Sequence, residues 1–303
     1  MHELLGAHQH DLALVIGNGI NRYGAVAGRN SWEGILTELA RRHIDPTHTS
    51  IPTGVSPTEF YDVLELAVGT TAGRTSLQAQ FCAQMVDWTP LPQHRLITQW
   101  AQRWATPVLT TNFEGTLGQA CSSKLRRCGA DKFTAHKFTA YYPWSSCYAP
   151  NPVVDPLKSF AIWHINGMQV YRQSIRLGLS HYMGSVERAR GWLNKSGTRL
   201  FGAKDIRSWP GANTWLQVFL HKPLLIFGLG LGENEVFLRW LLIERAKYFK
   251  RFPDRSRPGW YVHVEGSRDV DPGKKIFLEG MGIHPYPVPD HASIYGEKTW
   301  SLV

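Results

Sequence analysis

Short apolar runs alternate along this chain with longer stretches whose apolar residues recur at helical spacing. The runs have the length of buried strands and occupy residues 12–16, 107–110, 160–164, 223–228 and 260–264. Strands that are apolar on both faces are typical of a parallel sheet covered by helices. The pattern therefore predicts an α/β protein with a Rossmann-like parallel sheet and helices on both faces.

The stretches between these runs carry helix-start signals. Ser31 can cap a helix over residues 32–39. Residues 56–59, Ser-Pro-Thr-Glu, have the form of a capping box with proline at the first helical position. That box begins a helix with Phe60 and Leu64 on its apolar face. Further helices are expected near residues 76–88, 93–104 and 233–250.

We expect a single domain over residues 1–303, because no strong linker divides the chain. Residues 123–158 depart from the alternation, since they are rich in proline, serine, aromatic and basic residues. They contain a short repeat, KFTAH followed by KFTA, at residues 132–140. We favour a surface insertion with a hairpin here, over a substrate lid or a partner-binding element. Residues 183–221 look mostly helical and are a candidate helical subdomain.

Composition indicates a folded protein, with 43% hydrophobic and 19% charged residues. No apolar run approaches the roughly 20 residues that span a bilayer. Residues 1–10 lack the basic start and apolar middle of a signal peptide. These features predict a cytoplasmic protein without a membrane association.

The chain carries a net charge of +9, from 33 Lys and Arg against 24 Asp and Glu. The cations are scattered in short clusters, which favours a solvated basic face. An anionic ligand or a nucleic acid is the alternative partner. Several of the 12 Trp lie at helical apolar spacing, which favours the core or a protein interface over base stacking.

The four cysteines form no Cys-x-x-Cys pair, which argues against a structural zinc site, and we expect no metal. Disulfides are not expected in a cytoplasmic protein. The cysteines stand at positions 82, 121, 128 and 147.

Polar or glycine-rich clusters follow four of the apolar runs. Because the carboxyl ends of parallel strands share one edge of a sheet, these clusters predict a single convergent site. In the first cluster, the missing side chains of the two glycines would let a diphosphate approach the backbone amides. Each cluster also has a plain structural explanation: an empty turn for the Gly-x-Gly, a helix cap for Asn112, and a first-turn helix acid for Glu114 or Glu233. The clusters are Gly17, Asn18, Gly19 and Asn21; Thr110 to Glu114; His164 to Gly167; and Gly228 to Glu233.

The order Gly-x-Gly, Thr-x-Asn-x-acid, His-x-x-Gly and Gly-x-x-Leu resembles the sirtuin fold. More closely, it is similar to bacterial sirtuin-like proteins of anti-phage defence, which hydrolyse NAD. Residues 174–186, SIRLGLSHYMGSV, also resemble the segment after the His motif in that branch. The resemblance covers roughly residues 12–265 through spaced motifs, and it implies that the single domain is sirtuin-like.

The resemblance implies NAD as substrate, with Asn112 holding the nicotinamide ribose and the attacking water. A side-chain amide suits that task because it offers both a donor and an acceptor. Glu114 takes the place of the family's usual Asp, and Gly228 begins a turn that resembles the Gly-Thr-Ser-Leu turn along the dinucleotide. The NAD-binding residues predicted in this way are Gly17, Asn18, Gly19, Asn21, Thr111, Glu114, Gly167, Gly228, Gly230 and Glu233.

The catalytic histidine of the family directly precedes the glycine, where this chain has Asn166. His164 lies two positions earlier, on the same side of a strand but displaced by about 6 to 7 Å. An imidazole can take a proton near neutral pH, whereas an amide cannot. The predicted catalytic set is therefore Asn112, His164 and Asn166. Three interpretations follow: His164 or another histidine serves as the base, the chain is catalytically impaired, or Asn166 replaces a histidine of the natural chain. His164 could equally be a core histidine that is bonded to the backbone.

Sirtuin deacylases carry a zinc module of two Cys-x-x-Cys pairs, which this chain lacks, so water is the simpler acceptor. The resemblance then implies an NAD hydrolase that acts in anti-phage defence, gated by a partner or by oligomerisation. The alternative is a catalytically silent NAD- or ADP-ribose-binding module that assembles a complex with an ATPase or a nucleic-acid sensor. A third interpretation is direct nucleic-acid binding through the basic insertion. A hydride-transfer enzyme is disfavoured, because Arg22 stands where a dehydrogenase fingerprint has its third glycine.

Overall fold

The computed structural model of the protein describes residues 1–25, 30–69, 76–129, 142–195, 197–203, 205–232, 235–267 and 269–301. Eight strands within these residues form one sheet, in the order β3-β4-β5-β2-β1-β6-β7-β8. The strands are β1 (Ala13–Ile16), β2 (Val108–Thr110), β3 (Lys124–Arg127), β4 (Ser146–Ala149), β5 (Ile162–His164), β6 (Leu224–Phe227), β7 (Gly259–Val264) and β8 (Ile283–Val288).

The strands from β5 to β8 across the sheet are all parallel to their neighbours. The chain leaves central β1 toward β2 and β5, and then returns to the other side of β1 for β6, β7 and β8. This is the Rossmann strand order, and its direction reverses between β1 and β6. The predicted Rossmann-like parallel sheet is confirmed.

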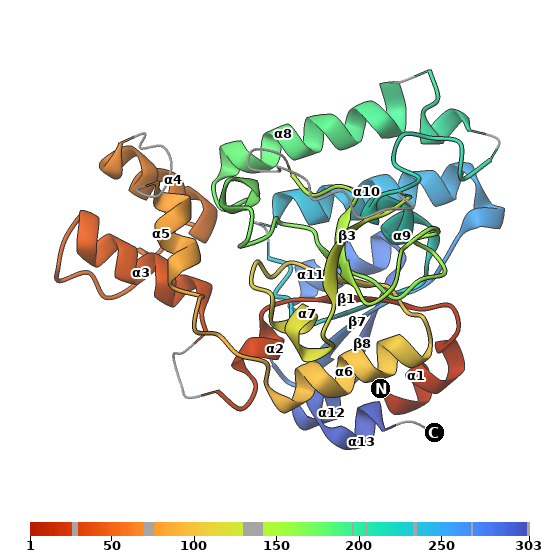
Figure 1. Ribbon diagram of the computed structural model, residues 1–303, viewed down its shortest axis with the longest axis horizontal. Helices are drawn as coiled ribbons and strands as arrows, with labels where there is room; N and C mark the ends of the chain where they lie inside the picture. The colour runs from red at the N-terminus through yellow and green to blue at the C-terminus, as the bar shows by residue number, and fades with distance from the viewer. Residues whose placement is uncertain are drawn as a thin grey trace.

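Helices cover both faces of the sheet, as predicted (Figure 1). One face packs on α1 (His2–His8), α2 (Gly19–Arg22), α6 (Pro92–Arg103), α7 (Thr116–Ala120), α12 (Ala292–Tyr295) and α13 (Glu297–Trp300). The other face packs on α8 (Leu179–Arg190), α9 (Trp215–His221), α10 (Val236–Arg251) and α11 (Pro272–Gly280). The helix predicted to start at Glu233 starts instead at Val236, and Glu233 lies outside the described residues.

Three helices stand beside the sheet as a separate helical lobe, seen at the left of Figure 1. They are α3 (Trp32–His43), α4 (Pro57–Val68) and α5 (Leu77–Ala83). Their buried side chains form a core of their own, to which Phe113, Ile175 and Leu177 from outside the lobe belong. The predicted caps begin these helices: Ser31 accepts from the amide of Gly34, and residues 56–59 form the capping box. The sequence predicted the helices but not that they form a lobe.

The ends of the irregular stretch 123–158 extend the sheet. β3 pairs with β4 in antiparallel fashion, and β4 adjoins β5 through Tyr148 and Ile162. The repeat at residues 132–140 lies outside the described residues.

Residues 183–221 contain parts of α8 and α9, a π-helical turn (Gly191–Lys195) and a 3₁₀ turn (Leu200–Gly202). Their buried side chains, including Leu193 and Trp215, belong to the same core as the sheet. Two further 3₁₀ turns are Arg172–Ser174 and Pro253–Arg255. No helix within the described ranges is both long and apolar enough to cross a membrane. All four cysteines are free thiols.

Candidate functional site

A pocket of about 830 Å³ lies over the carboxyl ends of β1, β6 and β7 and extends to the helical lobe. It therefore sits at the point where the strand order reverses, which is where open α/β sheets bind ligands. Trp32, Tyr61 and Phe81 bring the lobe into its wall. Five of the residues predicted from sequence line it, namely Asn18, Gly19, Thr111, Gly228 and Gly230. Gly17, Asn21, Asn112, Glu114, His164, Asn166 and Gly167 are not part of its lining, and Glu233 is outside the described residues.

The glycines of the first turn pack against the turn after β6. The amide of Gly17 donates to the carbonyl of Phe227 at 3.0 Å, and that of Gly19 donates to Gly228 at 2.8 Å. A Cβ atom on Gly17 would lie 2.6 Å from the Cα of Leu229, which is closer than real Cβ contacts. We expected these amides and this space to serve a diphosphate. In this structure the end of β6 and the turn after it engage both amides and fill the space beside Gly17. The role of these glycines in binding a dinucleotide stays a prediction.

The end of β2 places Thr111 in the pocket wall and Asn112 one residue further inside. The Thr110 hydroxyl donates to Ile16 and accepts from the amide of Asn112 at 3.1 Å, which fixes this turn. The Asn112 side chain donates to the carbonyl of Gly17 at 3.4 Å. Thr111 Oγ1 and Asn112 Oδ1 are buried without a hydrogen-bond partner among the described residues. These oxygens therefore keep hydrogen-bonding capacity beside the pocket.

A buried hydrogen-bond network ties Glu114 to the pocket wall. The Asn21 amide donates to Glu114 Oε1 and to Asn18 Oδ1, both at 2.9 Å. His94 Nδ1 accepts from a main-chain amide, so its Nε2 donates to Asn21 Oδ1 at 3.0 Å. Burial raises the pKa of Glu114 to about 7 and lowers the pKa of His94 to about 4. The network positions Asn18, but sequence reasoning missed His94 because 73 residues separate it from Asn21.

His164 is bonded to the backbone. Its Nδ1 donates to the carbonyl of Asn112 at 2.7 Å, and its ring meets that of Tyr148 edge-on. Burial lowers the pKa of His164 to about 4, so the ring is neutral at pH 7. Its Nε2 is buried and has no partner among the described side chains or main-chain groups. The ring holds the main chain of Asn112, which makes His164 a positioning residue.

Asn166 and Gly167 form the turn after β5. The carbonyl of Asn166 accepts from the amide of Arg176 at 2.7 Å, and its side-chain nitrogen is buried without a partner in the described part of the chain. Gly167 has a φ of +104°, and a Cβ there would lie 2.6 Å from the Cα of Ile175. The turn therefore requires glycine for its backbone shape and for its contact with the segment 174–176.

Arg176, Tyr182 and Glu235 are among the polar residues of the pocket wall that were not predicted. Arg176 stacks over Tyr142 at 5.1 Å and donates to Ser185, and Tyr182 follows on α8. Both fall in the stretch 174–186 that carried the family resemblance, and this was the signal that could have identified them. Glu235 directly precedes α10, two positions after Glu233. Burial raises the pKa of Glu235 to about 7, near the working pH of an acid–base group.

No protein-family model matches the chain, and no curated protein matches its sequence. A proposal for the function therefore rests on the fold and the pocket, and the sirtuin-like resemblance stays a prediction.

Proposed function

We propose that the pocket binds NAD and that the protein hydrolyses its nicotinamide–ribose bond to nicotinamide and ADP-ribose. The observation that carries this proposal is the position of the pocket, over the reversal of strand order in a Rossmann sheet. Its volume also falls in the range of ligand pockets, roughly 300–1,000 Å³. The hydroxyl of Thr111, which lines the pocket and lacks a partner among the described residues, supports a hydroxyl-rich ligand.

In this proposal the diphosphate of NAD is bound mainly by side chains. The amides of Gly17 and Gly19 are engaged by the β6 turn, so they are poor phosphate donors here. Arg22 and Arg176 both line the pocket and supply the positive charge that a diphosphate requires. Arg176 is held by Ser185 and by its stacking on Tyr142, which pre-orients the guanidinium.

Hydrolysis needs a group that takes a proton and balances positive charge on the ribose. In the proposed step the C1′–nitrogen bond breaks and its electron pair leaves with nicotinamide. A water oxygen then bonds to C1′, and the proton of that water passes to the Glu235 carboxylate. Glu235 suits both tasks because it lines the pocket and is negatively charged when deprotonated. Asn112, placed by His164, supports Thr111 at the pocket wall.

The test incubates the protein with NAD and uses chromatography to measure the nicotinamide that is released. We expect Glu235→Gln to reduce turnover by at least about 100-fold, while ADP-ribose still binds in calorimetry. Glu33→Gln is the matched control, since Glu33 is an exposed acid in the wall of the same pocket. We expect Asn112→Ala also to lower turnover. Equal activity of the Glu235 and Glu33 variants would remove Glu235 from the reaction.

The second candidate is a silent module that binds NAD or ADP-ribose without cutting it. The observation that favours it is the family's catalytic position, which holds Asn166 with its carbonyl bonded to Arg176. Binding without nicotinamide release, with or without partner proteins, would support this candidate and contradict hydrolysis. A large gain of turnover in Asn166→His would show that the chain lacks only its base.

A role as an effector of anti-phage defence, gated by a partner such as an ATPase or sensor or by homo-oligomerisation, rests on the family resemblance. It predicts that cellular NAD falls after phage infection in cells that express the protein, and not in cells that express Glu235→Gln. Analytical ultracentrifugation with and without NAD tests the oligomeric gate. Unchanged NAD during infection would contradict the effector role.

A further inference from the structure

Most of the net positive charge lies in a small part of the fold. Residues 187–195, 197–203 and 247–257 hold nine Lys and Arg but only two Asp and Glu, an excess of seven. The excess over the whole chain is nine, so the remainder is close to neutral. The nine cations are Arg188, Arg190, Lys195, Arg199, Lys247, Lys250, Arg251, Arg255 and Arg257.

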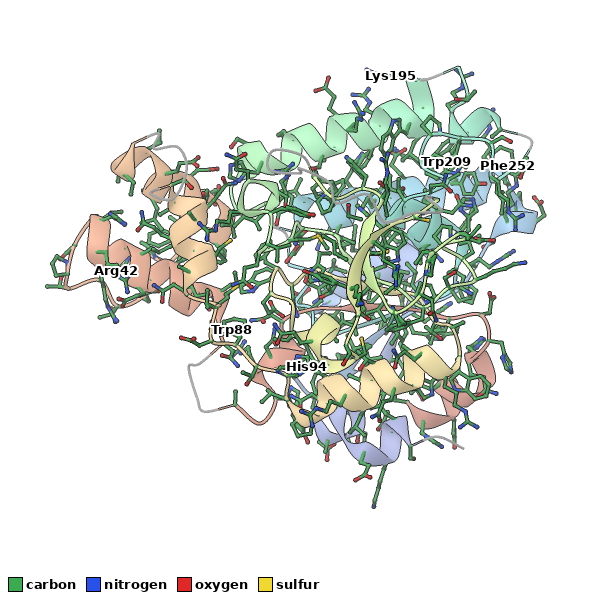
Figure 2. The ribbon with its side chains drawn as sticks, viewed as in Figure 1. Arg42, Trp88, His94, Lys195, Trp209 and Phe252 are labelled. Atoms are coloured by element: carbon green, nitrogen blue, oxygen red, sulfur yellow. The ribbon has the colours of Figure 1, made fainter. Side chains whose placement is uncertain are left out.

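These segments meet at one end of the molecule, which we call the basic end. Helices α8 and α10 lie side by side and finish together there (Figure 1). Asn194, after α8, donates to Glu244 of α10 at 3.1 Å, and Arg255 donates to the carbonyl of Ala203. Figure 2 shows Lys195 and Phe252 at the same upper-right end. The cations therefore form one surface.

The side chains of the basic end are presented to solvent. Seven of the nine cations are exposed, while Arg255 and Arg257 are half-buried. Arg188 stacks on Trp192 at 5.2 Å, and Arg255 stacks on Phe252 at 4.6 Å. Stacking holds the guanidinium of Arg188 in place and leaves its edge available for hydrogen bonds. The Arg255 guanidinium also donates to the carbonyl of Ala203 and to the hydroxyl of Tyr248.

Helix dipoles explain only part of this charge. Cations are favoured in the last turn of a helix, which accounts for Arg188, Arg190, Lys250 and Arg251. Lys195, Arg199, Arg255 and Arg257 lie beyond those helix ends, in turns and loops. Lys247 is paired with Glu244 of α10 at 2.7 Å. A ligand that gathers cations from several elements explains the cations that neither a helix end nor this ion pair explains.

We propose that the basic end binds the phosphodiester backbone of nucleic acid. Arg and Lys are the main partners of backbone phosphates, and such contacts need no fixed sequence. A protein partner or an inserted amphipathic helix would instead bury exposed apolar side chains. An anionic membrane surface could attract the same cations, and the vesicle measurement below distinguishes it. None of the large exposed hydrophobic side chains in the described ranges belongs to the segments of the basic end.

The basic end lies away from the pocket. The wall of the pocket includes Tyr182 near the start of α8 and Glu235 just before α10, whereas the basic end lies at the far ends of the same helices. The 16 residues of α10 span about 24 Å. Substitutions at the basic end therefore leave the residues of the pocket unchanged, and the proposal does not depend on NAD hydrolysis.

The test compares two variants that each remove four exposed cations. The first is Arg190→Ala, Lys195→Ala, Lys250→Ala and Arg251→Ala at the basic end. The matched control is Arg42→Ala, Arg95→Ala, Lys275→Ala and Lys298→Ala elsewhere on the surface. Fluorescence anisotropy with a 30-base-pair DNA duplex, a single strand and an RNA of the same sequence measures affinity across salt concentrations. Circular dichroism checks that both variants fold.

We expect the full chain to bind at least one of the three probes, with affinity falling steeply as salt rises. For duplex DNA the slope of log K against log salt should shrink by about 0.9 for each phosphate that is no longer neutralised, or about 3 to 4 for the basic-end variant. Its affinity at low salt should fall at least about tenfold, with little change in the control. The proposal is overturned if both variants weaken binding equally, if no probe binds, or if anionic vesicles bind and nucleic acid does not.

Discussion

The contact between the two glycine turns makes a sharp prediction for Gly17→Ala. Gly17 directly follows β1, and its missing side chain faces the turn at Gly228 and Leu229. An added Cβ would lie 2.6 Å from the Cα of Leu229, where ordinary contacts begin at 3.4 Å. The clash is with backbone, so no side-chain rotation relieves it. The turns must separate by more than the roughly 0.8 Å between those two distances, because the carbonyl oxygen of Gly228 would lie closer to the Cβ than the Cα of Leu229 does.

That separation has a measurable cost. Overpacking of a rigid site costs about 1–3 kcal/mol. The two turn hydrogen bonds, from Gly17 to Phe227 and from Gly19 to Gly228, would lengthen together. Each contributes about 1 kcal/mol net. We therefore expect the free energy of unfolding to fall by roughly 3–5 kcal/mol, which is a large share of the stability of an ordinary domain.

The measurement is urea unfolding followed by tryptophan fluorescence, with the slope m compared to ensure a common transition. Gly230→Ala is the matched control, because Gly230 lies in the same pocket wall and no atom lies within 4 Å of an added Cβ. It should unfold at the same urea concentration as the native chain. If Gly17→Ala keeps its stability and only its nucleotide affinity falls, the glycine serves the ligand and its packing role is refuted.

Three further predictions concern stability. Burial lowers the pKa of His94 and His164 to about 4, so the unfolded chain binds more protons than the folded chain between pH 6.5 and 4. These groups therefore make stability fall as pH falls through that window. Between pH 6.5 and 4.5 the melting temperature of His164→Gln should fall less than that of the native chain, and an identical fall would contradict a neutral buried ring. Leu64→Ala, in the core of the lobe, should lower the free energy of unfolding in denaturant by about 2–5 kcal/mol, and an unchanged value would contradict a packed core there. The Asp62 carboxylate accepts from the amide of Leu179 and so connects the lobe to α8. Asp62→Ala should lower the free energy of unfolding by about 0.5–2 kcal/mol. Amide hydrogen exchange should increase at the start of α8 rather than in the sheet.

The sequence was sufficient for the elements whose signals are local. A buried strand such as Leu224–Phe227 is apolar at every position, and the cap at Ser56 bonds within three residues of itself. Such features depend on neighbours in the chain, and the structure reproduces them. The parallel arrangement of the strands could also be predicted, because strands that alternate with helices along a chain form few other kinds of sheet.

Features that depend on distant pairing were not predicted. β8 carries Pro285 and Pro287, which argue against a central strand, and it joins the sheet only at the edge, where a missing amide is tolerated. β3 is rich in charge and has no apolar pattern. The lobe was missed because helix periodicity shows which face is buried, but not which partner buries it.

At the candidate site, the sequence predicts where residues lie better than it predicts what each residue does. Strand-end clusters predicted a site at the edge of the sheet where a pocket lies, since Asn18, Thr111 and Gly228 all line it. Roles depend on which partner occupies each polar atom, and that information is not local. The imidazole of His164 is the stronger base by type, but the backbone of Asn112 engages its Nδ1, and its ring does not line the pocket. No motif marks the carboxyl of Glu235, yet it lies in the pocket wall, and this position is why we propose it as the acid–base group.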